Sequence, residues 1–185
     1  MTSPKLPSFA SPTAAQQALL AAGTDPQQYL TFYVGEEMFA MGILAIREII
    51  EYHALTEVPL VPPLIRGVIN LRGSVVPVVD LAVRFERTPR PSSKRTCIVV
   101  VETQHHDAAL ENTSPQKMGV VVDAVSEVLE IAPQAIEPAP EFGTHLRSDF
   151  IQGMAHIRQQ FVVVLDIDRI LWLPEIAVRS SLQTE

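Results

Sequence analysis

The nucleophiles and metal ligands of this sequence are few and poorly placed for catalysis. Its single cysteine, Cys97, lies in the apolar run TCIVVV, where a small side chain usually packs inside a strand. His105 and His106 are adjacent, so an extended chain would point them in opposite directions, and neither an H-E-x-x-H sequence nor a cysteine pair accompanies them. The sequence G-x-S-x-G, which presents a catalytic serine, does not occur. These patterns predict a protein that is not an enzyme and that binds no metal and no cofactor.

Two further patterns suggest phosphate or cation binding, and each has a simpler interpretation. Gly67 and Gly73 precede Ser74, but their spacing is one residue too long for a phosphate-binding loop and the required lysine is missing. Asp166 and Asp168 fit better as the cap and the first-turn charge of a short helix than as a pair of metal ligands.

The composition limits the class of partner. A formal net charge of −7 argues against nucleic acid, because phosphate binding depends on clustered Lys and Arg. No run approaches the roughly 18 apolar residues of a membrane span. One cysteine permits no disulfide within the chain, which fits a reducing compartment. We therefore expect a cytoplasmic protein with no nucleic-acid partner and no direct insertion into a membrane.

Two charged residues stand out because they lie among apolar neighbours. Glu48 lies in LAIREIIE, and Arg72 lies at the tip of a predicted hairpin, GVINLRGSVVP. Such a residue is either part of a structural ion pair or a recognition point. For Glu48 we favour recognition, since the segment offers no obvious basic partner apart from Arg47. For Arg72 we favour a structural role, because Arg158 occupies an equivalent hairpin.

The pattern between the ends of the chain is mostly that of strands. Residues 29–34, 75–79 and 96–101 are short and rich in β-branched and aromatic side chains. Pro77 has no amide proton, so residues 75–79 should form an edge strand or be bulged. Asp80 and Asp166 should cap short helices at 81–85 and 167–173. Residues 103–117 are polar and predict a surface loop.

An internal repeat organises these elements. Residues 64–85 align without a gap on residues 150–171 at an offset of 86, which matches Gly67 with Gly153 and Arg72 with Arg158. Residues 42–51 align on residues 121–130 at an offset of 79 and match Glu48 with Glu127. Because a unit of about 70 residues has a marginal core, two such units should share one. The repeat predicts a mainly β protein made of two small five-stranded barrels that share a hydrophobic seam.

The domain boundaries follow from this pattern. We expect a flexible leader at residues 1–26, with a transient helix between Ser11 and Gly23. A single domain should span residues 27–173, as two pseudo-repeats at about 28–93 and 94–173. Residues 174–185 should form a C-terminal tail.

Several of these segments resemble one protein family in the right order. GVINLRGSVVPVVDL (67–81) resembles the signature hairpin of the CheW-type chemotaxis coupling proteins. So do ILAIREII (43–50), GVVVDAVSEVL (119–129), IEPAPEF (136–142) and FIQGMA followed by VVVLDIDRIL. The resemblance implies two intertwined SH3-like barrels with short capping helices. It also implies a non-enzymatic adaptor that binds the regulatory domain of the histidine kinase CheA and the cytoplasmic tip of chemoreceptors (methyl-accepting chemotaxis proteins), as part of a membrane-associated array.

Carried over position by position, the resemblance implies receptor-facing residues. They are Ile46, Glu48, Gly67, Arg72 and Gly119. The kinase contact should lie on a barrel end, with an apolar rim for which the turn residues Leu60, Val61, Leu64 and Ile65 are candidates.

Alternatives remain open at this point. The chain also resembles the coupling module of a CheV-like protein without its receiver domain, which would serve another two-component chemosensory pathway. The regulatory domain of the kinase itself is a further relative, disfavoured because no ATP-binding module accompanies it. An enzyme that uses Glu48 or Glu127 as a general base is the remaining alternative. The sequence does not distinguish a flagellar from a pilus-type pathway.

Overall fold

The computed structural model describes residues 25–107, 112–140 and 146–173. The predicted leader helix and C-terminal tail lie outside these residues. The strands are β1 (Gln27–Val34), β2 (Glu37–Gly42), β3 (Ile46–Glu51), β4 (Ile65–Leu71), β5 (Ser74–Asp80), β6 (Cys97–Asp107), β7 (Asn112–Val122), β8 (Ala124–Ile131), β9 (Ile136–Glu137), β10 (Ile151–Ile157) and β11 (Gln160–Leu165). Two short α-helices, α2 (Leu81–Arg84) and α3 (Ile167–Ile170), follow β5 and β11. Short 3-10 helices lie at Ile43–Ala45, Pro133–Ala135 and Ser148–Phe150.

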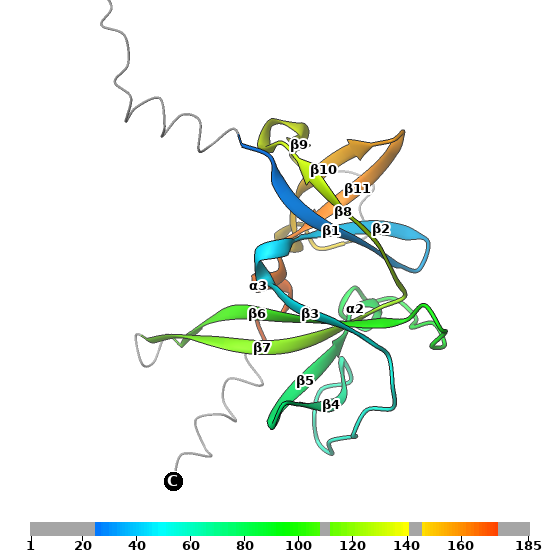
Figure 1. Ribbon diagram of the computed structural model, residues 1–185, viewed down its shortest axis with the longest axis vertical. Coiled ribbons are helices and arrows are strands. Elements are labelled where there is room, and N and C mark those ends of the chain that lie inside the picture. Colours follow the sequence, from blue (N-terminus) through cyan, green and yellow to red (C-terminus); the bar gives the residue numbers. More distant parts are fainter. Residues whose placement is uncertain (1–24, 108–111, 141–145, 174–185) are drawn as a thin grey trace, which may run out of the picture.

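The strands form two sheets, and each sheet takes strands from both halves of the chain. The six-stranded sheet has the order β8-β1-β2-β11-β10-β9, and the five-stranded sheet has the order β3-β6-β7-β5-β4. Figure 1 shows the blue β1 and β2 in one layer with β8 to β11, while the green β6 and β7 lie in the other layer with β3 to β5. The first hairpin of each repeat therefore pairs with the later strands of the other repeat, which confirms the prediction of two intertwined barrels.

The repeat holds at the level of topology. Strands β1, β2, β3, β4 and β5 of the first repeat correspond to β6, β7, β8, β10 and β11 of the second. When each strand is exchanged for its counterpart, the order β8-β1-β2-β11-β10 of one sheet becomes the order β3-β6-β7-β5-β4 of the other. The exception is the two-residue strand β9, which pairs with Met154 and Ala155 of β10. Its counterpart in the first repeat is a single bridge between Thr56 and Val68. One barrel thus has six strands where five were expected, because the pairing that is a single bridge in the first repeat spans two residues in the second.

Three apolar clusters fill the molecule. One lies inside each barrel, around Val162 and Val164 in the six-stranded sheet and around Val76 and Val78 in the five-stranded sheet. The largest lies between them and draws residues from both sheets and both helices. Strand β6 has a continuous apolar sequence because both of its faces are buried. Ile98 and Val100 point into the barrel, while Val99 and Val101 point into the shared cluster. The predicted hydrophobic seam is therefore present.

Aromatic and polar contacts add to this seam. Phe85, which follows α2, lies 5.3 Å from Phe39 and 6.4 Å from Phe150 between ring centroids. The Arg84 guanidinium donates a hydrogen bond to the carbonyl of Ile170 at the end of α3 (2.8 Å). Since Phe85 and Arg84 belong to the first repeat and their partners Phe150 and Ile170 to the second, the contacts tie the two repeats together.

The two predicted helix caps are present. The Asp80 carboxylate accepts hydrogen bonds from the amides of Ala82 and Val83, and Asp166 accepts one from Arg169. Both helices are shorter than expected and end at Arg84 and Ile170. None of the helices in the described ranges is both long and apolar enough to span a bilayer.

Two expectations about single segments are wrong. Residues 103–117 are not a surface loop over most of their length, because β6 and β7 pair from Cys97–Val122 out to Asp107–Asn112. Cross-strand pairing stabilised a polar sequence that looks like a loop when read alone. Strand β5 is neither an edge strand, since it lies between β4 and β7, nor bulged at Pro77, which pairs with Val68 in continuous register. Its parallel pairing with β7 begins only at Val78, so Pro77 needs no amide proton on that side.

Candidate interaction site

All five predicted receptor-facing residues lie in the five-stranded barrel. Ile46 and Glu48 are on β3, Gly67 is on β4, Gly119 is on β7, and Arg72 is in the turn between β4 and β5. β3 and β4 are at opposite ends of the sheet order, so only closure of the barrel can bring them together. The structure therefore places on one barrel a set of residues that the sequence spreads from position 46 to position 119.

The closure is marked by an ion pair between Arg72 and Glu48. The Nη2 atom of Arg72 lies 3.3 Å from Oε2 of Glu48. The Arg72 side chain is 84% exposed and that of Glu48 is 26% exposed. Arg72 has a φ of +52°, in the tight turn where Asn70 also accepts a hydrogen bond from the amide of Gly73 (3.0 Å). The segment around Glu48 indeed offers it no local basic partner, and the partner it does have, Arg72, lies 24 residues away in the β4–β5 turn.

A bulge in β3 gives Arg47 and Glu48 different ion-pair partners. The register against β6 shifts between Ile46 and Glu48, so Arg47 is the extra residue. The Arg47 guanidinium instead forms two hydrogen bonds with Glu102, of 2.9 and 3.2 Å. These hydrogen bonds lower the pKa of the Glu102 carboxyl. Arg47 is thus occupied on β6, and Glu48 is left to pair with Arg72.

The two glycines of the predicted site are buried. Gly67 has a φ of +151°, and a Cβ atom there would lie 2.5 Å from the carbonyl oxygen of Thr56. A Cβ atom at Gly119 would lie 2.9 Å from Cγ2 of Ile98 and 3.1 Å from Cγ2 of Val78. Each glycine permits a close approach inside the barrel wall. A larger residue at Gly67 would displace the backbone at Thr56, and one at Gly119 would displace the side chains of Ile98 and Val78.

Two apolar side chains of the same barrel are exposed, Ile49 on β3 and Val75 on β5. The register pairs Glu48 with Val100 of the barrel interior and Ile49 with Val99 of the shared cluster, so Glu48 and Ile49 leave opposite faces of β3. The barrel therefore presents an accessible guanidinium at the β4–β5 turn and, separately, exposed apolar side chains on its outer face.

The apolar rim proposed for the kinase is only partly exposed. Leu60 is largely accessible and has a positive φ of +61°. Val61 and Leu64 are partly buried against the shared cluster, and Ile65 is buried within it. The expectation that Ile65 lies on an open rim is therefore wrong, because it packs in the core from the start of β4.

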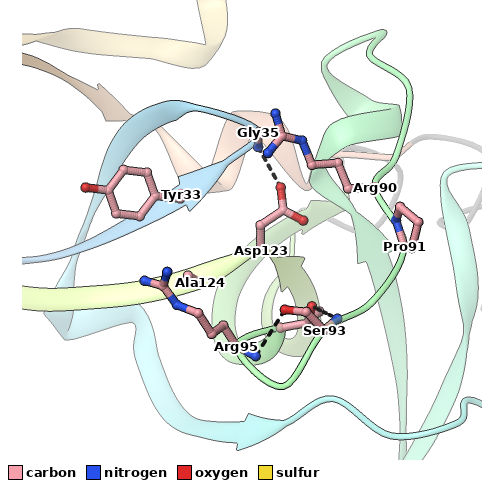
Figure 2. A pocket seen from close by; sticks show the side chains of 9 residues that line it. Tyr33, Gly35, Arg90, Pro91, Ser93, Arg95, Asp123 and Ala124 are labelled. Carbon is pink, nitrogen blue, oxygen red and sulfur yellow. Dashed lines mark hydrogen bonds between the residues drawn. The ribbon is translucent and has the colours of Figure 1, made fainter.

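A separate hollow of about 450 Å³ lies where the turn between β1 and β2 meets the linker before β6. Figure 2 shows the Asp123 carboxylate directed at Gly35, with the Arg90 guanidinium beside them and Arg95 turned toward Ala124. Asp123 accepts a hydrogen bond from the Gly35 amide (2.6 Å), and its own amide donates to the Tyr33 carbonyl (2.9 Å). These hydrogen bonds hold the first hairpin against the corner between β7 and β8. The residues around this hollow therefore help to join the two repeats.

The thiol of Cys97 is poorly suited to nucleophilic chemistry. Burial raises the pKa of the Cys97 thiol, and Glu51 adds to the effect, which makes this thiol a weak nucleophile. Within the described ranges, no three His, Cys, Asp or Glu side chains gather closely enough to hold a metal ion. The described residues form two joined barrels with accessible charged and apolar side chains.

Comparisons with known proteins agree with this architecture. Residues 28–174 match the model of the CheW-like domain family. The chain is 33% identical over 159 residues to the chemotaxis protein CheW of Klebsiella aerogenes, which covers 86% of this chain and 90% of that protein. It is 30% identical over 142 residues to a probable chemotaxis protein CheW of Rhizobium etli, covering 77% and 85% of the two chains. The crystal structure of the scaffolding protein TtCheW from Thermoanaerobacter tengcongensis superposes with a TM-score of 0.69 at 29% identity, covering 91% of this chain and 95% of that one. The chain therefore belongs to the CheW family, a family of chemotaxis scaffold proteins.

Sequence reasoning missed the contact between Glu48 and Arg72 and treated the two residues separately. A signal was present, because both residues have a repeat counterpart of the same type, Glu127 and Arg158. Two residue types that recur together at equivalent positions are a sign that they interact.

Proposed function

We propose that this protein is a non-enzymatic cytoplasmic adaptor that couples chemoreceptors to the histidine kinase CheA in a chemosensory array of flagellar or pilus type. Family membership over residues 28–174 supports the proposal. The observation that carries the receptor contact is the grouping of Ile46, Glu48, Gly67, Arg72 and Gly119 on one barrel, with the Arg72 guanidinium accessible.

The roles of these residues follow from their positions. Arg72 contacts the receptor tip through its accessible guanidinium, while Glu48 holds the arginine in place through the ion pair, which exchanges the roles that the sequence favoured for these two residues. Gly67 and Gly119 act indirectly, because they allow the barrel wall to close. The kinase regulatory domain binds elsewhere, at a barrel end.

Reconstitution tests this function. The purified protein is mixed with CheA and a soluble receptor cytoplasmic fragment, and kinase autophosphorylation is measured with and without it. We expect stimulation only when all three are present, and no phosphate on the adaptor itself. Arg72→Glu should abolish the stimulation, while Arg90→Ala, which removes an exposed arginine paired with Glu36 at 3.7 Å, should not. Equal stimulation without the adaptor, or transfer of phosphate to it, would contradict the proposal.

A further inference from the structure

A hollow of about 610 Å³ opens beside the first residues of β1. Its walls include residues 26–28 at the start of β1, residues 42–45 at the corner between β2 and β3, and residues 165–168 at the start of α3. Figure 1 shows this corner, in cyan, next to α3. Leu44 lies in the wall and is 87% exposed, the highest value among the large hydrophobic side chains of the described residues. The described part of the chain therefore leaves this hollow open, with an exposed leucine in it.

The internal repeat gives the open hollow a counterpart on the other barrel. The offsets of 79 and 86 residues carry three residues of its wall onto three residues that line a second hollow. These pairs are Leu44 with Asp123, Gln152 with Arg66, and Asp166 with Asp80. The second hollow has a volume of only about 10 Å³. The two sites are thus built alike, but one is open and the other is closed.

The residues that close the second hollow come from the linker before β6. Pro89, Arg90 and Ser92 line this hollow, and the linker leads directly into Cys97 at the start of β6. Figure 2 shows the Arg90 guanidinium beside the Asp123 carboxylate. In this repeat, the segment that precedes the first strand therefore folds over the corner and fills the hollow.

The strand registers show which residue of β1 corresponds to Cys97. Gln28 pairs with Glu130 on β8, and Cys97 pairs with Glu51 on β3. Glu51 and Glu130 are repeat counterparts, so Gln28 is the counterpart of Cys97. Positions before β1 can therefore be compared with positions in the linker by counting back from these two residues.

The same count reaches an apolar segment before β1. Residues 89–92 lie five to eight residues before Cys97, and the same steps back from Gln28 reach residues 20–23. These residues lie outside the described part of the chain. Their sequence, LAAG, ends the uncharged run TAAQQALLAAG (13–23). An apolar segment is thus attached next to the open hollow, at the position that the linker has next to the closed one.

The chemistry of the wall and of the segment changes together between the two sites. At the closed hollow, Asp123 of the corner lies beside Arg90 of the linker. At the open hollow, the counterpart of Asp123 is Leu44, and the same count makes Ala21, which follows Leu20, the counterpart of Arg90. A charged corner therefore goes with a charged segment, and an apolar corner goes with an apolar segment. Contact between the apolar pair would remove the Leu44 side chain from water, which favours docking.

We propose that residues 18–23 dock in the open hollow of their own chain and cover Leu44, in the place that residues 89–92 take on the other barrel. Only Thr24 and Asp25 separate this segment from Pro26 in the wall of the hollow. A segment attached so closely has an effective concentration in the millimolar range, so a small apolar contact is enough to hold it. The inference goes beyond the proposed function and does not depend on it.

Thiol labelling of the full chain tests the inference. A maleimide is applied to Leu44→Cys and to its matched control Leu60→Cys, since Leu60 is 85% exposed and lines neither hollow. Adding Leu20→Glu should raise the labelling rate of Leu44→Cys about tenfold, as expected for a segment that is docked about nine-tenths of the time. It should leave the rate of Leu60→Cys unchanged. Leu6→Glu, the same change outside the docking segment, should leave Leu44→Cys slow.

Peptide mass spectrometry separates the thiol at position 44 from Cys97, and an unchanged rate at Cys97 shows that a variant remains folded. Equal rates for Leu44→Cys with and without Leu20→Glu would overturn the inference. If Val178→Glu rather than Leu20→Glu raises the rate, residues 174–185 occupy the hollow and the inference is wrong. If dilution of the chain with the unchanged leader raises the rate, the segment of a second copy occupies the hollow, which also overturns docking within one chain.

Discussion

Arg72 and Glu48 contact each other across the closure of one barrel, and Arg158 and Glu127 repeat that contact across the other. In both pairs a β-turn supplies the arginine, and the strand at the far end of the sheet supplies the glutamate. Each of these contacts is therefore evidence that its barrel is closed. It also leaves a guanidinium accessible at the surface, since the arginine is the more exposed member of each pair.

The first prediction concerns the stability of this pair. Arg72→Ala and Glu48→Ala should each lower the free energy of unfolding by less than about 1 kcal/mol, since exposed ion pairs contribute little. Both should nevertheless weaken receptor binding. Urea denaturation and calorimetry measure the two effects separately. A fall in melting temperature of ten degrees or more for Glu48→Lys would show that the pair is mainly structural.

Gly67 should be highly sensitive to substitution, even by alanine. Gly67→Ala would force a Cβ atom against the Thr56 carbonyl and strain a φ of +151°, so we expect a loss of at least about 2 kcal/mol. Gly42→Ala is the matched control, because Gly42 has a φ of −60° and open space around it. Its stability should change by no more than about 1 kcal/mol, in either direction. Equal losses for the two variants in urea denaturation would contradict this account.

The intertwined topology predicts that neither repeat folds alone. A fragment of residues 28–93 lacks β8 and β11, the partners of β1 and β2, and also β6 and β7, the partners of β3 and β5. We expect an unfolded fragment by circular dichroism, and a folded complex when it is co-expressed with residues 94–173. A sharp melting transition of the 28–93 fragment by itself would show that the repeats are separate units.

The two helix caps should differ in importance although they are repeat counterparts. Asp80 is buried, accepts two amide hydrogen bonds and lies 3.5 Å from Nε of Arg66. Asp166 is more exposed and accepts one hydrogen bond. Asp80→Ala should cost about 1–2 kcal/mol, and Asp166→Ala should cost less. Thermal denaturation of both variants checks the order, and the reverse order would contradict the role of burial.

A pH dependence should arise from Glu102. Hydrogen bonds from Arg47 lower the pKa of this carboxyl in the folded state, so the folded protein binds fewer protons there than the unfolded chain. The contribution is fully present above the ordinary glutamate pKa of about 4.3, and it is lost as the pH falls through the lower folded value. Urea denaturation between about pH 7 and pH 3 should show this loss in the wild type and not in Glu102→Gln.

The control for this experiment is Glu57→Gln, since Glu57 makes no ion pair with the residues that the structure describes. It should keep the acid-dependent loss seen in the wild type. If the difference between wild type and Glu102→Gln is the same at all pH values in this range, the ion pair with Arg47 is not the cause.

The sequence by itself determined the local features of this protein. Short runs rich in β-branched and aromatic side chains predicted the strands, the gapless alignments predicted the repeat, and the caps at Asp80 and Asp166 followed from residue type and position. The resemblance to the CheW family was also available from the motifs around Arg72. Strands and caps depend on neighbours within a few residues, and a repeat shows as similarity between two segments of the same sequence, so a linear pattern carries both.

Only the tertiary structure decided which strands pair and which charges meet. Both hairpins are apolar on two faces, so their sequences fit either barrel, and it is chain topology that sends β1 and β2 to the partners of the other repeat. The polar residues 103–107 and 112–117 became strands because each faces the other across a ladder. Glu48 found Arg72 rather than Arg47 because a bulge turned Arg47 toward Glu102 and barrel closure brought the β4–β5 turn beside β3. Such contacts join residues that are distant in sequence, and their energies depend on a geometry that exists only after the barrels have closed.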